Sequence, residues 1–289
     1  MPAGLKVGET RSAIVMAHGF TGVREVSPDK CAARFAREGF VILVFDYRCF
    51  GGGGGAPRSR VLRPDQVVDY RNAISWASLQ ADVDPDRIGV SGTSMSGGHV
   101  IHLAAFDRRI KAVAAQGPLT NVRSTDIATW PAEQQAGFPG WLAAARTERA
   151  KTGKPAEIPV AAPADKPSFR PLQAWYDALV ELSKPAPSGR NRLVVESPDT
   201  HILHEPVTNL ARGSPTLLMM IVASDDVITP TADARKRLSS RRASRSGSWS
   251  FRDGASTPTT DPDTTSSRVR QPTGSSSGRS PDLPAGADP

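Results

Sequence analysis

The chain has few cysteines, the residues that form disulfides in small proteins and bind metal ions in many others. Cysteine occurs twice in 289 residues, at Cys31 and Cys49. Two distant cysteines form neither a disulfide framework nor a zinc spacing, so we expect no metal, no cofactor and a reducing, cytoplasmic location. The N-terminus lacks the apolar core of a signal peptide and no apolar run reaches membrane-spanning length, so we expect no membrane partner.

Acidic residues are outnumbered by basic ones, 29 to 36, which gives a net charge of +7. The arginines are dispersed, and the sequence has no basic helix, RNA-binding aromatic signature or zinc-finger spacing. We therefore expect no nucleic-acid partner. The length suits one large domain with an inserted segment and leaves the oligomeric state open.

The end of the chain, residues 239–289, contains no Lys, Glu or His and no periodic apolar pattern. Its Ser, Thr, Pro, Arg, Asp and Gly residues bury too little apolar surface to offset the entropy cost of ordering, so we predict a disordered, low-complexity tail. Two origins remain open. The tail is either an Arg/Ser-rich interaction arm or an out-of-frame reading of a GC-rich gene.

A Gly-x-Ser-x-Ser segment, residues 92–96, follows a short apolar run. Gly92, Ser94 and Ser96 have the spacing of a nucleophile elbow, in which a strand turns sharply into a helix and exposes the central serine hydroxyl. Ser96 stands where the strict motif has glycine. We predict Ser94 as the nucleophile and the Met95 N–H as an oxyanion donor. The alternative is an ordinary Gly/Ser-rich turn.

Apolar runs alternate with helical patterns before and after this segment. The runs cover residues 13–17, 41–46, 88–91, 110–115 and 217–222, and helical patterns include 27–39 and 64–81. This alternation predicts an α/β fold, with a doubly wound parallel sheet of about five strands and helices on both faces. His18 and Gly19 begin the loop after the first strand. If the chain is a hydrolase, the Phe20 N–H of that loop supplies the second oxyanion donor.

Five motifs in order give the chain a family resemblance. They are residues 18–22, 46–51, 84–89, 92–100 and 226–230. The chain resembles the α/β-hydrolase superfamily, in particular the dienelactone-hydrolase-like and Xaa-Pro-peptidase-like branch that includes fungal polyketide transferases. The resemblance implies a serine hydrolase or acyl transferase with a Ser–Asp–His triad in that chain order. It implies a domain over residues 1–238, with an inserted lid at about 119–213 and a sheet truncated at both ends.

Asp226 is the predicted triad acid, because it lies after the last confident strand at the family's spacing from Pro230. A triad carboxylate orients the imidazole and stabilises the imidazolium. The alternative is that Asp225 or Asp226 only caps the helix expected near Thr231.

The triad histidine is missing from its expected place, because no histidine follows His204. His18, His99 and His102 are expected to be structural, whereas His201 or His204 in the lid could reach the serine only by a different geometry. Two functions therefore compete. One is a serine hydrolase acting on a small-molecule ester, thioester or lactone. The other is a catalytically inactive homologue, truncated or frameshifted, that at most binds a small acyl ligand; a regulatory arm built on the basic tail is a third reading.

Overall fold

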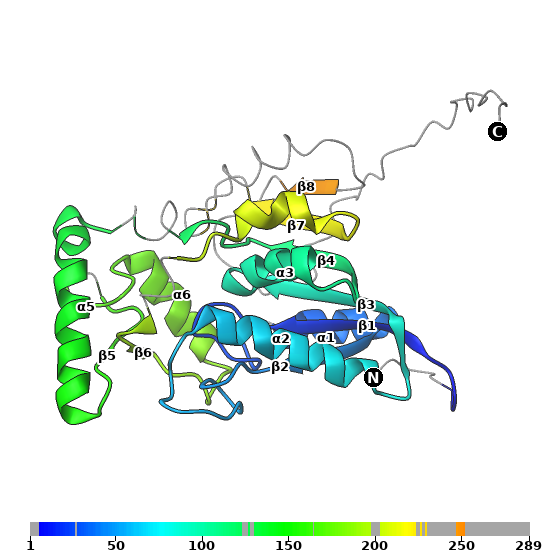
Figure 1. Ribbon diagram of the computed structural model, residues 1–289, viewed down its shortest axis with the longest axis horizontal. Coiled ribbons are helices and arrows are strands. Elements are labelled where there is room, and N and C mark those ends of the chain that lie inside the picture. Colours follow the sequence, from blue (N-terminus) through cyan, green and yellow to red (C-terminus); the bar gives the residue numbers. More distant parts are fainter. Residues whose placement is uncertain are drawn as a thin grey trace, which may run out of the picture.

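The centre of the computed structural model is a six-stranded sheet in the order β2-β1-β3-β4-β7-β8, with every neighbouring pair parallel (Figure 1). The structure describes residues 6–26, 28–122, 127, 130–163, 165–197, 203–223, 226, 229 and 247–251. The strands are β1 (Arg11–Ala17), β2 (Val41–Phe45), β3 (Val83–Thr93), β4 (Ile110–Gln116), β7 (Leu217–Ala223) and β8 (Gly247–Phe251). A doubly wound parallel sheet was the predicted fold, and it is confirmed.

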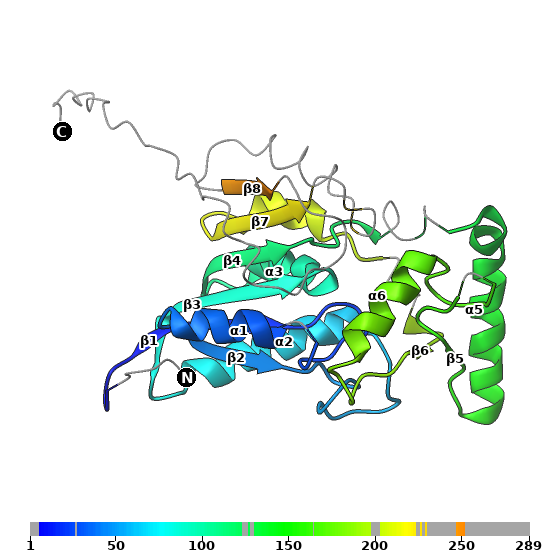
Figure 2. The same ribbon diagram turned by 180° about the vertical axis from the view of Figure 1, so that it is seen from behind.

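Helices cover the two faces of the sheet unequally. Figure 1 shows α2 (Arg63–Ser78) and α3 (Met95–Phe106) in front of the sheet, and Figure 2 shows α1 (Pro28–Arg37) on the opposite face. Sequence signals mark the start of α2 and the end of α1. Pro64 occupies the first turn of α2, where its missing N–H costs nothing, and Gly39 follows α1 with a φ of +92°. Ser27, the expected cap of α1, lies outside the described residues.

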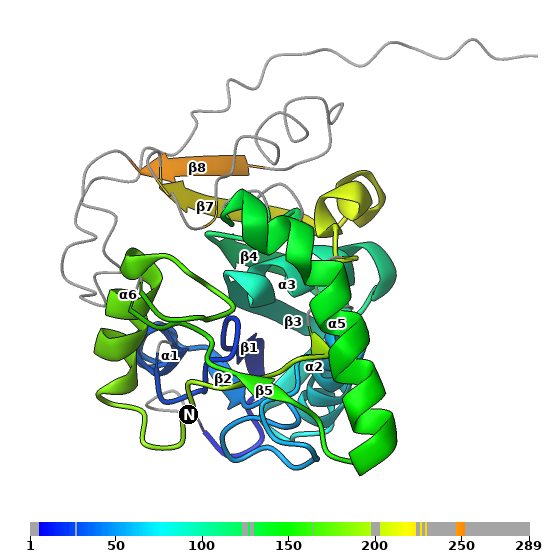
Figure 3. The same ribbon diagram turned by 90° about the vertical axis from the view of Figure 1, so that its left-hand side faces the viewer.

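A long segment between β4 and β7 contributes two helices and a small second sheet. These elements are α5 (Ala132–Thr152), β5 (Glu157–Ile158), α6 (Gln173–Ser183), β6 (Leu193–Val194) and the 3₁₀ helix η2 (Pro206–Gly213). β5 and β6 pair antiparallel. Figures 2 and 3 show α5 and α6 beyond the carboxyl ends of the main strands. Both helices lie within residues 119–213, the range of the predicted lid.

The sheet extends one strand further than the sequence predicted. Strand β8 pairs with β7 in a register that places Gly247 opposite Met219. It lies inside the range expected to be a structureless tail. Its sequence, Gly-Ser-Trp-Ser-Phe, alternates small and aromatic residues, a strand pattern that the composition of the whole tail conceals. The rest of the predicted tail lies outside the described residues.

The described helices include none that is both long and apolar enough to cross a lipid bilayer.

Candidate active site

The chain turns sharply at Ser94, between the end of β3 and the start of α3. Ser94 has φ 56° and ψ −120°, a strained conformation for a residue with a side chain. Its N–H donates to the Gln116 carbonyl (2.9 Å), and its carbonyl accepts from the N–H groups of Gly98 (3.1 Å) and Leu119 (2.9 Å). These bonds hold the backbone in place, and the residue as a whole is half-buried.

Gly92 and Gly97 explain why small residues surround this turn. A Cβ on Gly92 would overlap the backbone carbonyl of Ser96, and one on Gly97 would lie 2.9 Å from the Cα of Pro118. Strand, turn and helix therefore pack too closely for any larger residue at either position. The predicted elbow geometry is present.

Ser96 has a different environment from Ser94. It is fully buried, and its hydroxyl accepts a hydrogen bond from the Tyr47 hydroxyl (3.1 Å) and contacts the Tyr70 hydroxyl (2.7 Å). Tyr70 also accepts from the Ala17 N–H (3.0 Å) and donates to the Ser91 carbonyl (2.9 Å). Every hydroxyl proton therefore has an acceptor if Ser96 donates to Tyr70. This network joins the ends of β1 and β3 to α2 and α3.

Burial raises the pKa of Tyr47 well above its usual value, with the neighbouring Tyr70 acting in the same direction. Burial also raises the pKa of Tyr70. Both phenols therefore remain protonated at neutral pH and keep their donor roles. Ser96 is a structural serine in this arrangement, and the two tyrosines are site residues that the sequence analysis missed. Tyr47 lies within the motif at residues 46–51, but neither that motif nor any pattern around Tyr70 indicates these contacts, which join segments far apart in the chain.

The loop after β1 passes directly beside Ser94. A Cβ on Gly19 would lie 3.3 Å from the Ser94 Cβ and 3.8 Å from its hydroxyl oxygen. Glycine is therefore what allows this close approach. Phe20 follows in the same loop, and Met95 is the first residue of α3. Both predicted oxyanion donors thus lie in the segments that flank the Ser94 side chain.

His18 holds this loop in place. Its Nδ1 donates to the Gly19 carbonyl (2.9 Å), and its Nε2 accepts from the Tyr47 N–H (3.3 Å), which fixes the neutral tautomer. The ring packs edge-on against the rings of Tyr47 and Phe50. Burial lowers the pKa of His18 despite its hydrogen bond to Gly19 and the nearby Asp46 carboxylate. The structural role expected for His18 agrees with these contacts.

Asp226 lies at the same edge of the sheet as Ser94. Its carboxylate accepts from the Thr229 N–H (2.8 Å) and hydroxyl (2.6 Å). A Cβ on Gly117 would lie 3.5 Å from Asp226 Oδ2, and Gly117 follows Gln116, whose carbonyl binds the Ser94 N–H. The dipeptide Gln116–Gly117 at the end of β4 therefore binds the Ser94 backbone and lies close to the Asp226 carboxylate.

Three of the other histidines lie on or against helix α3. His99 Nε2 lies 3.0 Å from Gln66 Oε1, and the His204 ring packs edge-on against the His99 ring at 5.1 Å. His102 accepts from the Asn209 side-chain amide at 3.3 Å. Burial lowers the pKa of His102, and Arg71 acts in the same direction. His201 lies outside the described residues.

The inserted segment packs its aromatic residues onto the loop that follows β1. The Phe169 ring lies 5.6 Å from the Phe20 ring. The buried Arg170 guanidinium stacks over Phe20 (5.2 Å) and over Trp175 of α6 (4.9 Å). The irregular sequence of this segment gave no signal for these contacts. They place the inserted segment against the loop that flanks Ser94.

The strand order, the elbow after β3 and the acidic residue after β7 define a hydrolase of the α/β type. The family model described as X-Pro dipeptidyl-peptidase (S15 family) matches residues 2–192. The chain belongs to this family, which agrees with the branch that the sequence resembles.

Two curated relatives and one solved structure illustrate the likeness. The quorum-quenching protein AidA of Acinetobacter baumannii is 36% identical over 178 residues, which are 62% of this chain and 57% of AidA. The thiohydrolase aneE of Aspergillus aculeatus is 28% identical over 243 residues, 79% of this chain and 74% of the relative. The alpha/beta hydrolase GrgF from Penicillium sp. sh18 superposes with a TM-score of 0.75 at 22% identity, covering 88% of this chain and 83% of GrgF. The match thus spans little more than half of AidA.

Proposed function

We propose that the chain is a serine hydrolase of the esterase or acyl-transfer type with Ser94 as its nucleophile. The observation that supports this most strongly is the strained, half-buried Ser94 at the start of α3, beside the Gly19 backbone. Strain at one residue held by the surrounding backbone is typical of functional sites. The substrate is a small-molecule ester, thioester or lactone. The curated names of relatives, which include a thiohydrolase and a polyketide transferase, favour an acyl group carried as a thioester.

The chemistry follows from the positions of these groups. The Ser94 hydroxyl attacks the carbonyl carbon, and the carbonyl oxygen takes up negative charge. The N–H groups of Phe20 and Met95 hold this oxyanion, helped by the partial positive charge at the start of α3. The bond from the carbonyl carbon to the leaving oxygen or sulfur then breaks, and the proton lost by the Ser94 hydroxyl passes through solvent water to the departing alcohol or thiol. Water or a second hydroxyl or thiol acceptor then attacks the acyl-Ser94 carbonyl, takes the acyl group and returns a proton to the Ser94 oxygen. Asp226 is the carboxylate that would orient an imidazole.

No histidine follows Asp226 in the sequence, so both the base for attack and the base for deacylation are missing from the usual place. The missing base should slow the reaction. Ser94 reacts with activated acyl or phosphonyl compounds, but turnover is slow because a neutral hydroxyl is a weak nucleophile. An inactive homologue that only binds an acyl ligand is the second candidate, and the same missing histidine favours it.

A fluorophosphonate probe separates the two candidates. We expect it to label the wild type at Ser94, and the label should be lost in Ser94→Ala and kept in Ser96→Gly, which restores the strict motif. Peptide mapping identifies the labelled residue. A wild type that takes no label while binding an acyl ligand supports the inactive homologue. Labelling that survives Ser94→Ala but disappears in Ser96→Ala would reverse the assignment of the nucleophile.

A further inference from the structure

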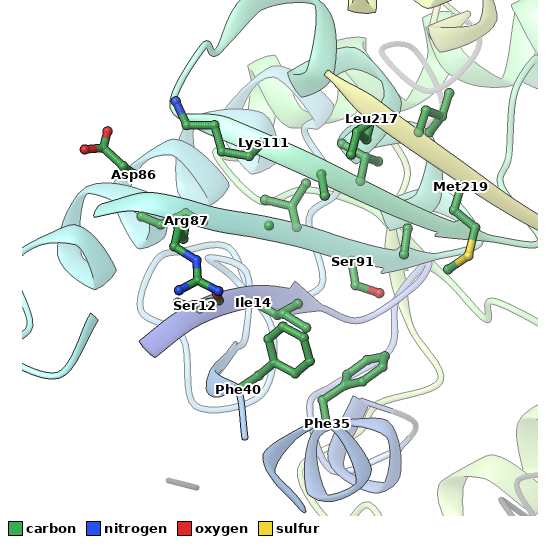
Figure 4. Close-up of a pocket in the computed structure, with 18 residues that line it drawn as sticks. Ser12, Ile14, Phe35, Phe40, Asp86, Arg87, Ser91, Lys111, Leu217 and Met219 are labelled. Carbon is green, nitrogen blue, oxygen red and sulfur yellow. The ribbon is translucent and has the colours of Figure 1, made fainter. Parts of the chain in front are cut away.

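The face of the sheet that carries α1 has an uncovered apolar cavity. Its volume is about 570 Å³, and it lies over β1, β3, β4 and β7 (Figure 4). Alternation along β7 directs Leu217 and Met219 to this face, where they are 47% and 38% exposed. Their neighbours Leu218 and Met220 point to the opposite face and are buried. Two large apolar side chains therefore stand in solvent at the wall of the cavity.

The cavity has a floor and two ridges. The floor consists of small residues on the two central strands, Gly89 and Ser91 of β3 with Ala112 and Ala114 of β4. One ridge is formed by Leu217 and Met219. The other ridge contains Ile14 of β1 and Phe35 of α1, with Phe40 beside them (Figure 4). The Leu217–Met219 ridge therefore lies directly beside an apolar groove on the same face.

The two longest segments outside the described residues contain few large apolar side chains. Residues 230–246 contain one large apolar side chain, Leu238, and residues 252–289 contain two, Val269 and Leu283. The other side chains in those ranges are mainly Ser, Thr, Arg, Asp, Pro, Gly and Ala. Exposed apolar area of this kind commonly marks a protein–protein contact.

We propose that this face is the contact between two copies of the chain. A two-fold axis places the Leu217–Met219 ridge of each copy in the small-residue groove of the other, because ridge and groove lie side by side on the same surface. Charge also suits self-association. Asp86, Arg87 and Lys111 line the same end of the cavity, so opposite charges can pair across the axis although the chain carries +7 overall (Figure 4).

Sedimentation velocity of the full chain over a range of concentrations tests the contact. We expect a reversible dimer for the wild type. The double variant Leu217→Gln/Met219→Gln should raise the dissociation constant about tenfold or more, because each dimer loses four buried apolar side chains. The matched control is Trp76→Gln/Leu79→Gln, which removes two apolar side chains, 56% and 81% exposed, at the end of α2. Circular dichroism and urea unfolding confirm that each variant is folded.

A monomeric wild type would overturn the proposal and assign the face to a terminal segment or to another partner. A dimer that survives the Leu217/Met219 change, or one that the control weakens equally, would also contradict it. Zero-length cross-linking of mixed ¹⁴N- and ¹⁵N-labelled wild type provides a test that needs no variant. We expect mixed-isotope cross-links between Asp86 and Lys111, and exclusively same-isotope cross-links would count against the two-fold contact.

Discussion

The hydroxyl groups of Ser96 and Tyr70 lie 2.7 Å apart in the core, directly behind the strained turn at Ser94. Ser96 occupies the position where the strict elbow motif has glycine. The structure gives a physical reason for the exchange, because the hydroxyl fills a site between two phenols that would otherwise lose a partner. Tyr70 also binds the end of β1 and the end of β3. The same bonds therefore fix the loop after β1 relative to the turn at Ser94.

Replacement of Tyr70 by Phe should destabilise the protein by about 1–3 kcal/mol, because buried polar groups of Ala17, Ser91 and Ser96 each lose a partner. Tyr47→Phe should cost less, since it removes a single 3.1 Å bond to Ser96. Urea unfolding followed by circular dichroism measures both changes. The half-buried Tyr176 of α6 provides the control, and its change to Phe should leave stability nearly unchanged. Equal losses for all three variants would contradict a specific role for the network.

Gly19→Ala should slow the labelling of Ser94 by a fluorophosphonate. The added methyl would lie 3.3 Å from both the Ser94 Cβ and the Thr93 carbonyl, so loop and nucleophile must move apart. Gly22→Ala is the matched control in the same loop, because its methyl meets its nearest neighbour, the His18 Cβ, at an ordinary 3.4 Å. Labelling rates of the two variants are compared with that of the wild type. Equal rates for Gly19→Ala and Gly22→Ala would show that the loop does not flank the reacting hydroxyl.

The sequence predicts the parts of this fold that local patterns encode. Apolar runs that alternate with helical patterns along the chain predict the strands β1, β2, β4 and β7. The small residues around Ser94 predict the sharp turn between β3 and α3. The Tyr47–Tyr70–Ser96 network and the stacking of Arg170 on Phe20 were not predicted, because they join residues 26 to 150 positions apart and the motifs that contain some of these residues do not indicate the contacts. Strand β8 was missed for another reason. Its pairing depends on main-chain hydrogen bonds to β7, which amino-acid composition does not reveal.

Stability should fall as the pH drops below about 6.5, the pKa of an unperturbed histidine. Burial lowers the folded-state pKa of His18, so the unfolded chain binds a proton more readily over this range, and protonation favours unfolding. Above that pH His18 is neutral in both the folded and the unfolded state, and its contribution to the free energy of unfolding is fully present. Urea unfolding at several pH values measures the trend. His18→Gln should flatten it, and so should His102→Gln, because burial also lowers the His102 pKa. A trend unchanged in both variants would assign the acid sensitivity to other groups.

Hydrolysis of a short activated ester should be slow in the wild type. Removing a triad member leaves a residual rate about a thousandfold to ten-thousandfold above that in water, supplied by the oxyanion hole and binding. We expect that residual, no faster, and its persistence in Ser94→Ala, because it does not depend on the serine hydroxyl. Because labelling by a fluorophosphonate needs only one attack, Ser94 should still take the label while turnover stays low. A rate typical of esterases that disappears on changing His201 or His204 would contradict this prediction. That result would identify a histidine of the inserted segment as the general base.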